Sequence, residues 1–267
     1  MAALVDKPVI QYLVEEASAS GIKEIIFVLN YSKDIIADYF SSRQHPHQKN
    51  AFKNSEAAKV NLAELNTLLK GIKFHNIKKT TTLGDGHSIF FAKSKIKKNE
   101  PFAVTMGDLL APPGNPFLKQ LIAVYQKTNA PVVSVERIPQ EEVSRYGVVS
   151  PKKSNGRLHE LKDIVEKPKV SEAPSNMILT GKYILTPEIF KHIEEVMKNN
   201  KTGEVRLADA LTSWVKTKPL YAYECVGKIH DTGNKFDFLK TTVQFAAAHK
   251  IFGKKFKTFI KEFSKKI

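Results

Sequence analysis

Two aspartates occupy positions from which a sheet could present carboxylates to a substrate. The strand-like run 102–106 leads into Gly107-Asp108, and Asp231 follows the strand-like run 220–226. Ligand sites in open α/β sheets lie beyond the carboxyl ends of strands, and one or two carboxylates with phosphate oxygens suit Mg²⁺. We interpret both residues as candidate magnesium ligands. A structural role stays open for each, since Asp108 could cap a turn and Asp231 could cap the helix expected from Lys235.

A glycine loop, Leu83-Gly84-Asp85-Gly86-His87, follows one strand-like segment and opens a helix-like one. Glycines let backbone amides approach a base or a phosphate closely, and a helix N-terminus favours anionic groups. The spacing matches neither the Walker A pattern nor the dinucleotide fingerprint, so it is a weak signal by itself.

The dipeptide Glu166-Lys167 ends a further strand-like segment, because Pro168 cannot continue a hydrogen-bonded ladder. At a strand end the carboxylate could accept hydrogen bonds from sugar hydroxyls while the ammonium reaches a phosphate. Two charged surface residues are the alternative. The sequence contains no Gly-x-Ser-x-Gly nucleophile elbow.

The elements that must position these residues alternate along the chain between helix-like and strand-like patterns. This alternation predicts an α/β fold with a mixed, mostly parallel sheet flanked by helices. Asp6 is expected to cap the first helix and Gly21 to end it. Helices are expected at 8–20, 32–40, 55–70, 86–95, 115–127, 187–199, 204–216 and 235–249, and strands at 24–30, 72–77, 101–106, 131–137, 146–150, 158–165, 176–185 and 220–226.

The composition favours one large, strongly basic domain. The 267 residues carry 42 Lys and Arg against 27 Asp and Glu, a formal charge of +15. The densest basic run, 254–266, has phenylalanines at helical spacing, which predicts an amphipathic helix with a lysine-coated outer face. A small anionic substrate suits this charge better than nucleic acid. The single Cys225, with no signal or membrane-spanning pattern, predicts a cytoplasmic protein without a membrane partner.

Seven stretches of the sequence, in order, are similar to those of one family. The chain resembles the bacterial UTP–glucose-1-phosphate uridylyltransferases, also called UDP-glucose pyrophosphorylases. The matching stretches, which span most of the chain, are Leu4-Val5-Asp6-Lys7-Pro8-Val9-Ile10-Gln11-Tyr12, Leu83-Gly84-Asp85-Gly86-His87, Tyr146-Gly147-Val148-Val149, Val165-Glu166-Lys167-Pro168-Lys169, Ala173-Pro174-Ser175-Asn176, Gly181-Lys182-Tyr183 and His230-Asp231-Thr232-Gly233-Asn234-Lys235.

The resemblance implies a Rossmann-like nucleotidyltransferase fold and a Mg²⁺-dependent reaction of UTP with glucose 1-phosphate that gives UDP-glucose and pyrophosphate. It also implies a homo-oligomer, dimer or tetramer, and one domain with a nucleotide-binding half (1–137), a sugar-binding half (138–233) and C-terminal helices (234–267). The resemblance implies that Asp108 and Lys167 are catalytic and that Asp108 and Asp231 are the metal ligands. It implies that Gly147, Glu166 and Gly181 lie along the sugar and that Lys167 lies at the sugar phosphate. It also implies that Gly84 and Gly86 pack against the uracil and that Lys79 lies at the base.

Two features depart from the family pattern. The family places a Gly-x-Gly-Thr-Arg loop on a first strand ahead of the segment that begins here at Leu4, and the printed sequence has three residues there. We therefore expect this strand and its triphosphate cradle to be absent, either because the start of the sequence is incorrect or truncated or because the chain is a degenerate relative. Lys79 stands where the family has a Gln that reads the uracil edge, and Lys offers donors only. The alternative to an active enzyme is an impaired or regulatory paralogue that binds sugar nucleotide or an active homologue.

Overall fold

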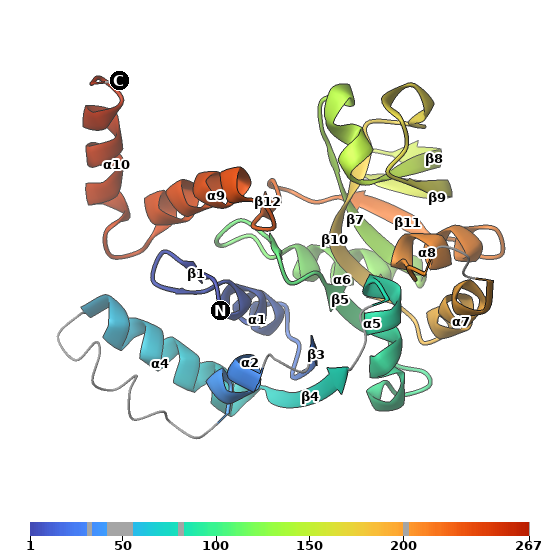
Figure 1. The fold of residues 1–267 in the computed structure, drawn as a ribbon, viewed down its shortest axis with the longest axis horizontal. Helices are drawn as coiled ribbons and strands as arrows, with labels where there is room; N and C mark the ends of the chain where they lie inside the picture. Colours follow the sequence, from blue (N-terminus) through green and yellow to red (C-terminus); the bar gives the residue numbers. More distant parts are fainter. Residues whose placement is uncertain (31–33, 42–55, 80–82, 200–202, 267) are drawn as a thin grey trace.

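The computed structural model describes residues 1–30, 34–41, 56–79, 83–199 and 203–266 (Figure 1). Its helices are α1 (Val9–Ala19), α2 (Asp34–Tyr39), α4 (Glu56–Gly71), α5 (Asp85–Phe91), α6 (Phe117–Thr128), α7 (Ile189–Asn199), α8 (Leu207–Val215), α9 (Lys235–Ala248) and α10 (Gly253–Phe263). Its strands are β1 (Ala3–Leu4), β2 (Lys7–Pro8), β3 (Glu24–Asn30), β4 (Lys73–Lys79), β5 (Phe102–Thr105), β6 (Leu109–Leu110), β7 (Val132–Arg137), β8 (Gly147–Asn155), β9 (Leu158–Glu166), β10 (Met177–Leu185), β11 (Tyr221–Glu224) and β12 (His230–Asp231).

The largest sheet has six strands in the order β5-β10-β7-β11-β9-β8. The mixed α/β class is confirmed, but parallel pairing is confined among the described strands to β7 with β11 and to the separate pair β3 and β4. The other ladders are antiparallel, so the parallel share is smaller than expected. A run of apolar β-formers indicates burial on both faces of a strand and carries no information on its direction.

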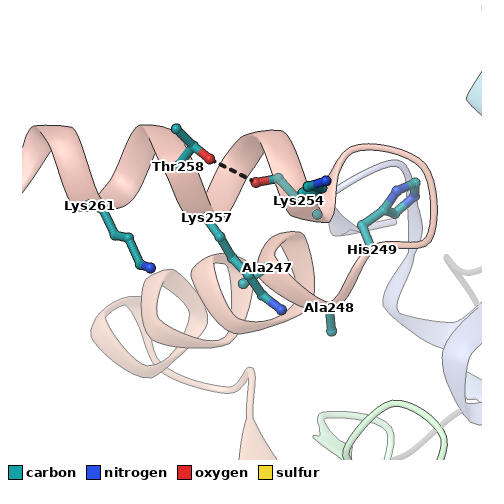
Figure 2. A pocket seen from close by; sticks show the side chains of 8 residues that line it. Ala247, Ala248, His249, Lys254, Lys257, Thr258 and Lys261 are labelled. Carbon is teal, nitrogen blue, oxygen red and sulfur yellow. Dashed lines mark hydrogen bonds between the residues drawn. The ribbon is translucent and has the colours of Figure 1, made fainter.

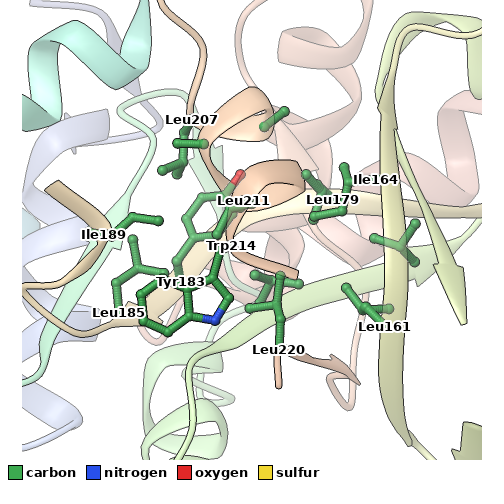
Figure 3. Packing of buried hydrophobic residues seen from close by; sticks show 14 of the residues in the cluster. Leu161, Ile164, Leu179, Tyr183, Leu185, Ile189, Leu207, Leu211, Trp214 and Leu220 are labelled. Atoms are coloured by element: carbon green, nitrogen blue, oxygen red, sulfur yellow. The ribbon is translucent and has the colours of Figure 1, made fainter. Parts of the chain in front are cut away.

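Helices α7 and α8 cover one face of this sheet through a continuous apolar core (Figure 3). On α8, Leu207, Leu211 and Trp214 recur at helical spacing and are at most 2% exposed. Tyr183 of β10 lies among them, and the indole Nε1 of Trp214 donates to the carbonyl of Pro219 at 3.1 Å. This packing fixes β10 between β5 and β7, and β10 carries two residues of the site, Gly181 and Lys182.

Helices α1 and α6 lie on a second apolar cluster, which joins the six-stranded sheet to the β3–β4 pair. Ile25 of β3 and Ala103 of β5 both pack against this cluster, which contains Phe117 and Leu121 of α6. Within the described residues, β3 is hydrogen-bonded to β4 alone and β5 to β10 alone. Side-chain packing therefore joins the two sheets where no described backbone ladder does.

The first helix begins differently from the sequence prediction. Pro8 occupies the N-cap of α1 without a side-chain hydrogen bond, so the predicted cap at Asp6 is wrong. The Asp6 carboxylate instead accepts hydrogen bonds from Asn61 Nδ2 and His249 Nε2, each at 2.8 Å. These partners are distant in sequence, which a local capping pattern does not include. Gly21, with φ of 86°, follows the helix end as predicted.

Among the described residues, no helix combines the length and apolarity needed to cross a membrane.

Candidate active site

Asp108 and Asp231 lie side by side, although 122 residues separate them in the sequence. The short strands β6 and β12 pair Leu109 with Asp231, and the Asp108 carbonyl accepts hydrogen bonds from Thr232 N and Thr232 Oγ1, each at 2.8 Å. A Cβ added to Gly233 would lie 2.8 Å from Asp108 Oδ2 and 3.1 Å from Asp231 Oδ1. Both carboxylates therefore lie next to the position that the Cβ of any other residue at 233 would occupy.

The cap alternative for Asp231 is wrong, because Asn234 is the N-cap of α9 and accepts from Asp237 N. This frees the Asp231 carboxylate to face Asp108. Its Oδ1 accepts a hydrogen bond from Gly233 N at 2.6 Å, which holds the side chain against the turn.

Asp108 and Asp231 are two acidic side chains held close together, and the charge of Asp231 affects the ionisation of Asp108. Burial raises the pKa of the Asp108 carboxyl; its own backbone amide and Lys182 oppose this, whereas the charge of Asp231 adds to it. The described residues contain no cluster of three or more His, Cys, Asp or Glu side chains arranged to hold a metal. Two carboxylates close together match Mg²⁺, which keeps several waters and takes its other ligands from substrate phosphates.

Gly181 supports the turn that carries Asp108. It interrupts the register of β10 against β7 and has φ of +70°, a conformation that side chains disfavour. A Cβ there would lie 2.4 Å from Leu109 Cδ1, and the Gly181 carbonyl accepts from Met106 N at 2.9 Å. The absence of a side chain at position 181 thus lets β10 pack directly against the turn that carries Asp108.

The next residue, Lys182, was not singled out from the sequence. Its side chain is fully buried, and its Nζ lies 2.9 Å from Glu16 Oε2 and donates to Thr105 Oγ1 at 2.6 Å. Glu16 Oε1 also accepts from the backbone N of Leu118, in the first turn of α6. This buried pair ties α1, α6, β5 and β10 together behind Asp108. The sequence of α1 gave no sign of this ion pair, because a glutamate beside an apolar helical stripe is expected to face solvent.

The glycine loop packs against the segment before α8. Cβ atoms on Gly84 and Gly86 would lie 2.5 Å and 3.0 Å from the carbonyl oxygen of Val205, and Gly84 has φ of +98°. Asp85 Oδ1 accepts from Leu207 N at 2.9 Å, so the loop also caps α8. Close backbone packing accounts for both glycines in the absence of any ligand.

Lys79, at the end of β4, joins this loop. Its Nζ donates to Ser88 Oγ, and that hydroxyl donates to the Gly84 carbonyl at 2.9 Å. The structure therefore brings Lys79 to the glycine loop, as the motif order indicates. Residues 80–82, which connect them, lie outside the described part of the chain.

Glu166 and Lys167 lie at the end of β9, opposite Gly147 of β8. A Cβ on Gly147 would lie 2.9 Å from Glu166 Oε2, so this glycine makes room for the carboxylate. Burial raises the pKa of the Glu166 carboxyl, whereas the positive charges of Lys167 and Arg206 lower it. Lys167 has φ of 46°, and its Nζ lies 4.0 Å from Glu166 Oε1 with the side chain 59% exposed. A lysine at a turned strand end, largely free in solvent, can reach an anion.

Comparison with known proteins places this arrangement in a class. The nucleotidyl transferase family profile matches residues 1–248. The chain belongs to this family.

Similar proteins narrow the assignment. The UTP–glucose-1-phosphate uridylyltransferase of Staphylococcus epidermidis is 37% identical over 98% of this chain and 89% of its own length. The enzyme of the same name from Bacillus subtilis is 37% identical over 94% of this chain and 84% of its own length. A UDP-glucose pyrophosphorylase solved with UDP-glucose has a TM-score of 0.82 at 33% identity, covering 93% of this chain and 90% of that one. The UTP-bound enzyme of Acinetobacter baumannii has a TM-score of 0.84 at 31% identity, covering 98% of this chain and 90% of that one. The chain is an enzyme of the UTP–glucose-1-phosphate uridylyltransferase type, as the motifs predicted.

Proposed function

We propose that this chain transfers UMP from UTP to glucose 1-phosphate, giving UDP-glucose and pyrophosphate, and that the transfer depends on Mg²⁺. The observation that carries the proposal is the convergence of Asp108 and Asp231 on Gly233. The names of its relatives supply the substrates, and the two carboxylates supply a place for the metal that such substrates bring.

In this proposal Asp108 and Asp231 would hold Mg²⁺, which, when bound, would neutralise charge on the phosphates of the nucleotide. Lys182, buried behind Asp108, lowers the pKa of that carboxyl and so favours its ionised form, while Glu16 opposes the fall that burial causes in the pKa of Lys182 itself. The sugar phosphate oxygen attacks the α-phosphorus directly, so the enzyme needs no nucleophile. Its contribution is positioning and charge stabilisation.

The sugar side is formed by the end of β9 and its neighbours. We assign Glu166, with Gly147 and Gly181, to the sugar, because the half-buried carboxylate can accept hydrogen bonds from hydroxyl groups. Lys167 is assigned to the sugar phosphate, because its exposed ammonium can leave the 4.0 Å contact with Glu166 for a stronger anionic partner.

The nucleotide side is formed by the end of β4 and the start of α5. We assign Gly84 and Gly86 to the uracil, where one face of the loop is held by Val205 and the other would pack on the base. Lys79 would meet the base edge after releasing Ser88. The division into halves at 137 and 233 follows this assignment.

The test is pyrophosphate release from UTP and glucose 1-phosphate, titrated with Mg²⁺. Asp108→Asn should abolish turnover without unfolding the protein, because it changes one metal ligand at constant volume. Asp38→Asn, which changes an exposed carboxylate on α2, is the matched control and should leave turnover unchanged. Equal turnover by both variants at saturating Mg²⁺ would refute the assignment of Asp108.

Lys79 favours a second candidate, a relative that binds sugar nucleotide without turning it over. A lysine cannot supply the acceptor that an amide offers to the uracil edge. Calorimetric binding of UDP-glucose by a chain that releases no pyrophosphate would support this candidate, and turnover would exclude it.

A further inference from the structure

The last two helices, α9 and α10, border an open hollow of about 390 Å³ (Figure 2). Lys254, Lys257 and Lys261 of α10, which we call the hollow lysines, line one side, and Ala247 and Ala248 at the end of α9 line the other. Figure 2 shows Lys257 and Lys261 directed toward α9. The lysines of α10 therefore do not form only an outer coat, as the sequence predicts, because three of them share a recess. Its volume is that of a pocket for a small molecule.

The hollow carries positive charge without a counter-charge. Its lining contains the three ammonium groups and the His249 ring, and no carboxylate among the described residues. Within the described part of the chain the hollow lysines form no ion pair, whereas the neighbouring Lys250 pairs with Glu64 at 3.2 Å. Like charges three and four positions apart on a helix repel each other. The arrangement therefore destabilises α10 unless an anion neutralises it.

The ends of the two helices do not change the sign of this charge. Helix α9 ends at Ala248 and α10 begins at Gly253, so the carbonyl end of one helix and the amide start of the other meet at the hollow. Their partial charges are opposite and oppose each other. A Cβ on Gly253 would lie 2.7 Å from the carbonyl oxygen of Ala247. The glycine thus lets the helices approach closely and sets the width of the hollow.

The rest of the lining indicates a ligand that is rich in phosphate and has no aromatic ring. Helix α9 contributes the methyl groups of Ala247 and Ala248, on which a nucleobase cannot stack as it does on a ring. The ring of His249 already stacks on Phe252 at a centroid distance of 3.7 Å, and its Nε2 lies 2.8 Å from Asp6 Oδ2. Lysine ammonium groups bind phosphate as point charges.

We propose that the hollow lysines bind a small anion with two or more phosphate groups, at a site separate from the one around Asp108. The hollow lysines span seven positions of α10, about 10 Å along the helix axis, which suits two phosphates of one small molecule. The 14 residues of α9 separate the hollow from the Asp231 turn by about 20 Å.

Helix α9 links the hollow to the candidate metal site. Thr241 Oγ1 donates to the Asp231 carbonyl at 3.3 Å, and the Phe245 ring meets the His230 ring edge to face at a centroid distance of 5.2 Å. A ligand at the end of α9 stabilises the helix that supports the Asp231 turn. Amide hydrogen exchange along α9 should therefore slow when inorganic tripolyphosphate binds. Unchanged exchange between residues 234 and 246 would refute this link.

Acetylation of individual lysines tests the location of the site. The full chain is acetylated in EDTA at constant ionic strength, with and without tripolyphosphate at about five times its Kd, and each lysine is quantified by mass spectrometry. Acetylation of the hollow lysines should slow about fivefold, whereas that of Lys265 and Lys266, which are exposed in the same terminal segment outside the lining, should slow less than about twofold. Equal protection of all five lysines would indicate a diffuse ion atmosphere and overturn the proposal.

Paired variants test the charges. Lys257→Gln with Lys261→Gln should raise the Kd for tripolyphosphate, measured by calorimetry, about tenfold or more, because two charge-assisted contacts are lost. Lys265→Gln with Lys266→Gln removes the same charge and should raise it less than about twofold. Both variants keep Asp108, so tripolyphosphate bound there is common to the two titrations, and unfolding curves establish that both fold. Equal losses, or tighter binding of a single-stranded RNA than of tripolyphosphate at the same salt concentration, would overturn the proposal.

Two phosphate compounds distinguish the sources of the ligand. Inorganic pyrophosphate is the product of the proposed reaction, and glucose 1,6-bisphosphate carries two phosphates on a sugar. Stronger protection of the hollow lysines by pyrophosphate would assign the site to that product, an assignment that rests on the proposed function. Stronger protection by the bisphosphate would assign it to a separate phosphorylated metabolite, whether or not the chain turns over UTP. Protection by neither compound would overturn the proposal.

Discussion

Removing one partner of the buried pair of Lys182 and Glu16 should destabilise the protein strongly. Both side chains are almost entirely buried, and the Lys182 ammonium has its contacts with Glu16 and Thr105. Replacing Lys182 by Met leaves the Glu16 carboxylate buried without its counter-charge, a loss that typically costs about 3–5 kcal/mol. We therefore expect Lys182→Met to lower the free energy of unfolding by about that amount, which corresponds to a fall of roughly 10 °C in Tm.

The assay is urea unfolding of the single and double variants. Glu16→Gln removes the other charge and keeps the acceptor for Leu118 N, so adding it to Lys182→Met should recover part of the loss. Lys218→Met is the control, because Lys218 pairs with Glu188 at a similar distance of 2.7 Å with half its side chain in water. Its cost should be about 0–1 kcal/mol. A Lys182→Met cost equal to that of the control, or additive losses in the double variant, would refute the reasoning.

Three further predictions concern the site and the thiol. Gly233→Ala should reduce Mg²⁺-dependent turnover sharply, since its Cβ would lie 2.8 Å from Asp108 Oδ2, and a Mg²⁺ titration that matches wild type would contradict this. Because burial raises the pKa of Asp108, turnover should fall on acidification with an apparent pKa above 3.8, and excess Mg²⁺ should move that midpoint to lower pH. Burial raises the pKa of Cys225 to about 12, so iodoacetamide should leave the native thiol unmodified at pH 8 and label it in urea; rapid native labelling would show that the thiol is accessible.

Local patterns predicted the elements well where they depend on near neighbours. The apolar runs at 24–30 and 131–137 became β3 and β7, and the helical stripe at 204–216 became α8. Strand direction and the start of α1 were predicted less well. A strand's direction depends on which neighbour it meets, and Asp6 bonds to Asn61 and His249 instead of to its own helix.

The site also combines features set by neighbouring residues with features set by distant parts of the chain. The sequence by itself determined that Asp108 ends a strand, that Gly84 and Gly86 open a helix and that Glu166 precedes a break, because each follows from residues a few positions apart. The folded chain alone decided that Asp231 meets Asp108 and that Lys182 lies behind Asp108, paired with Glu16. These contacts join segments far apart in sequence, and they depend on which surfaces the apolar core brings together.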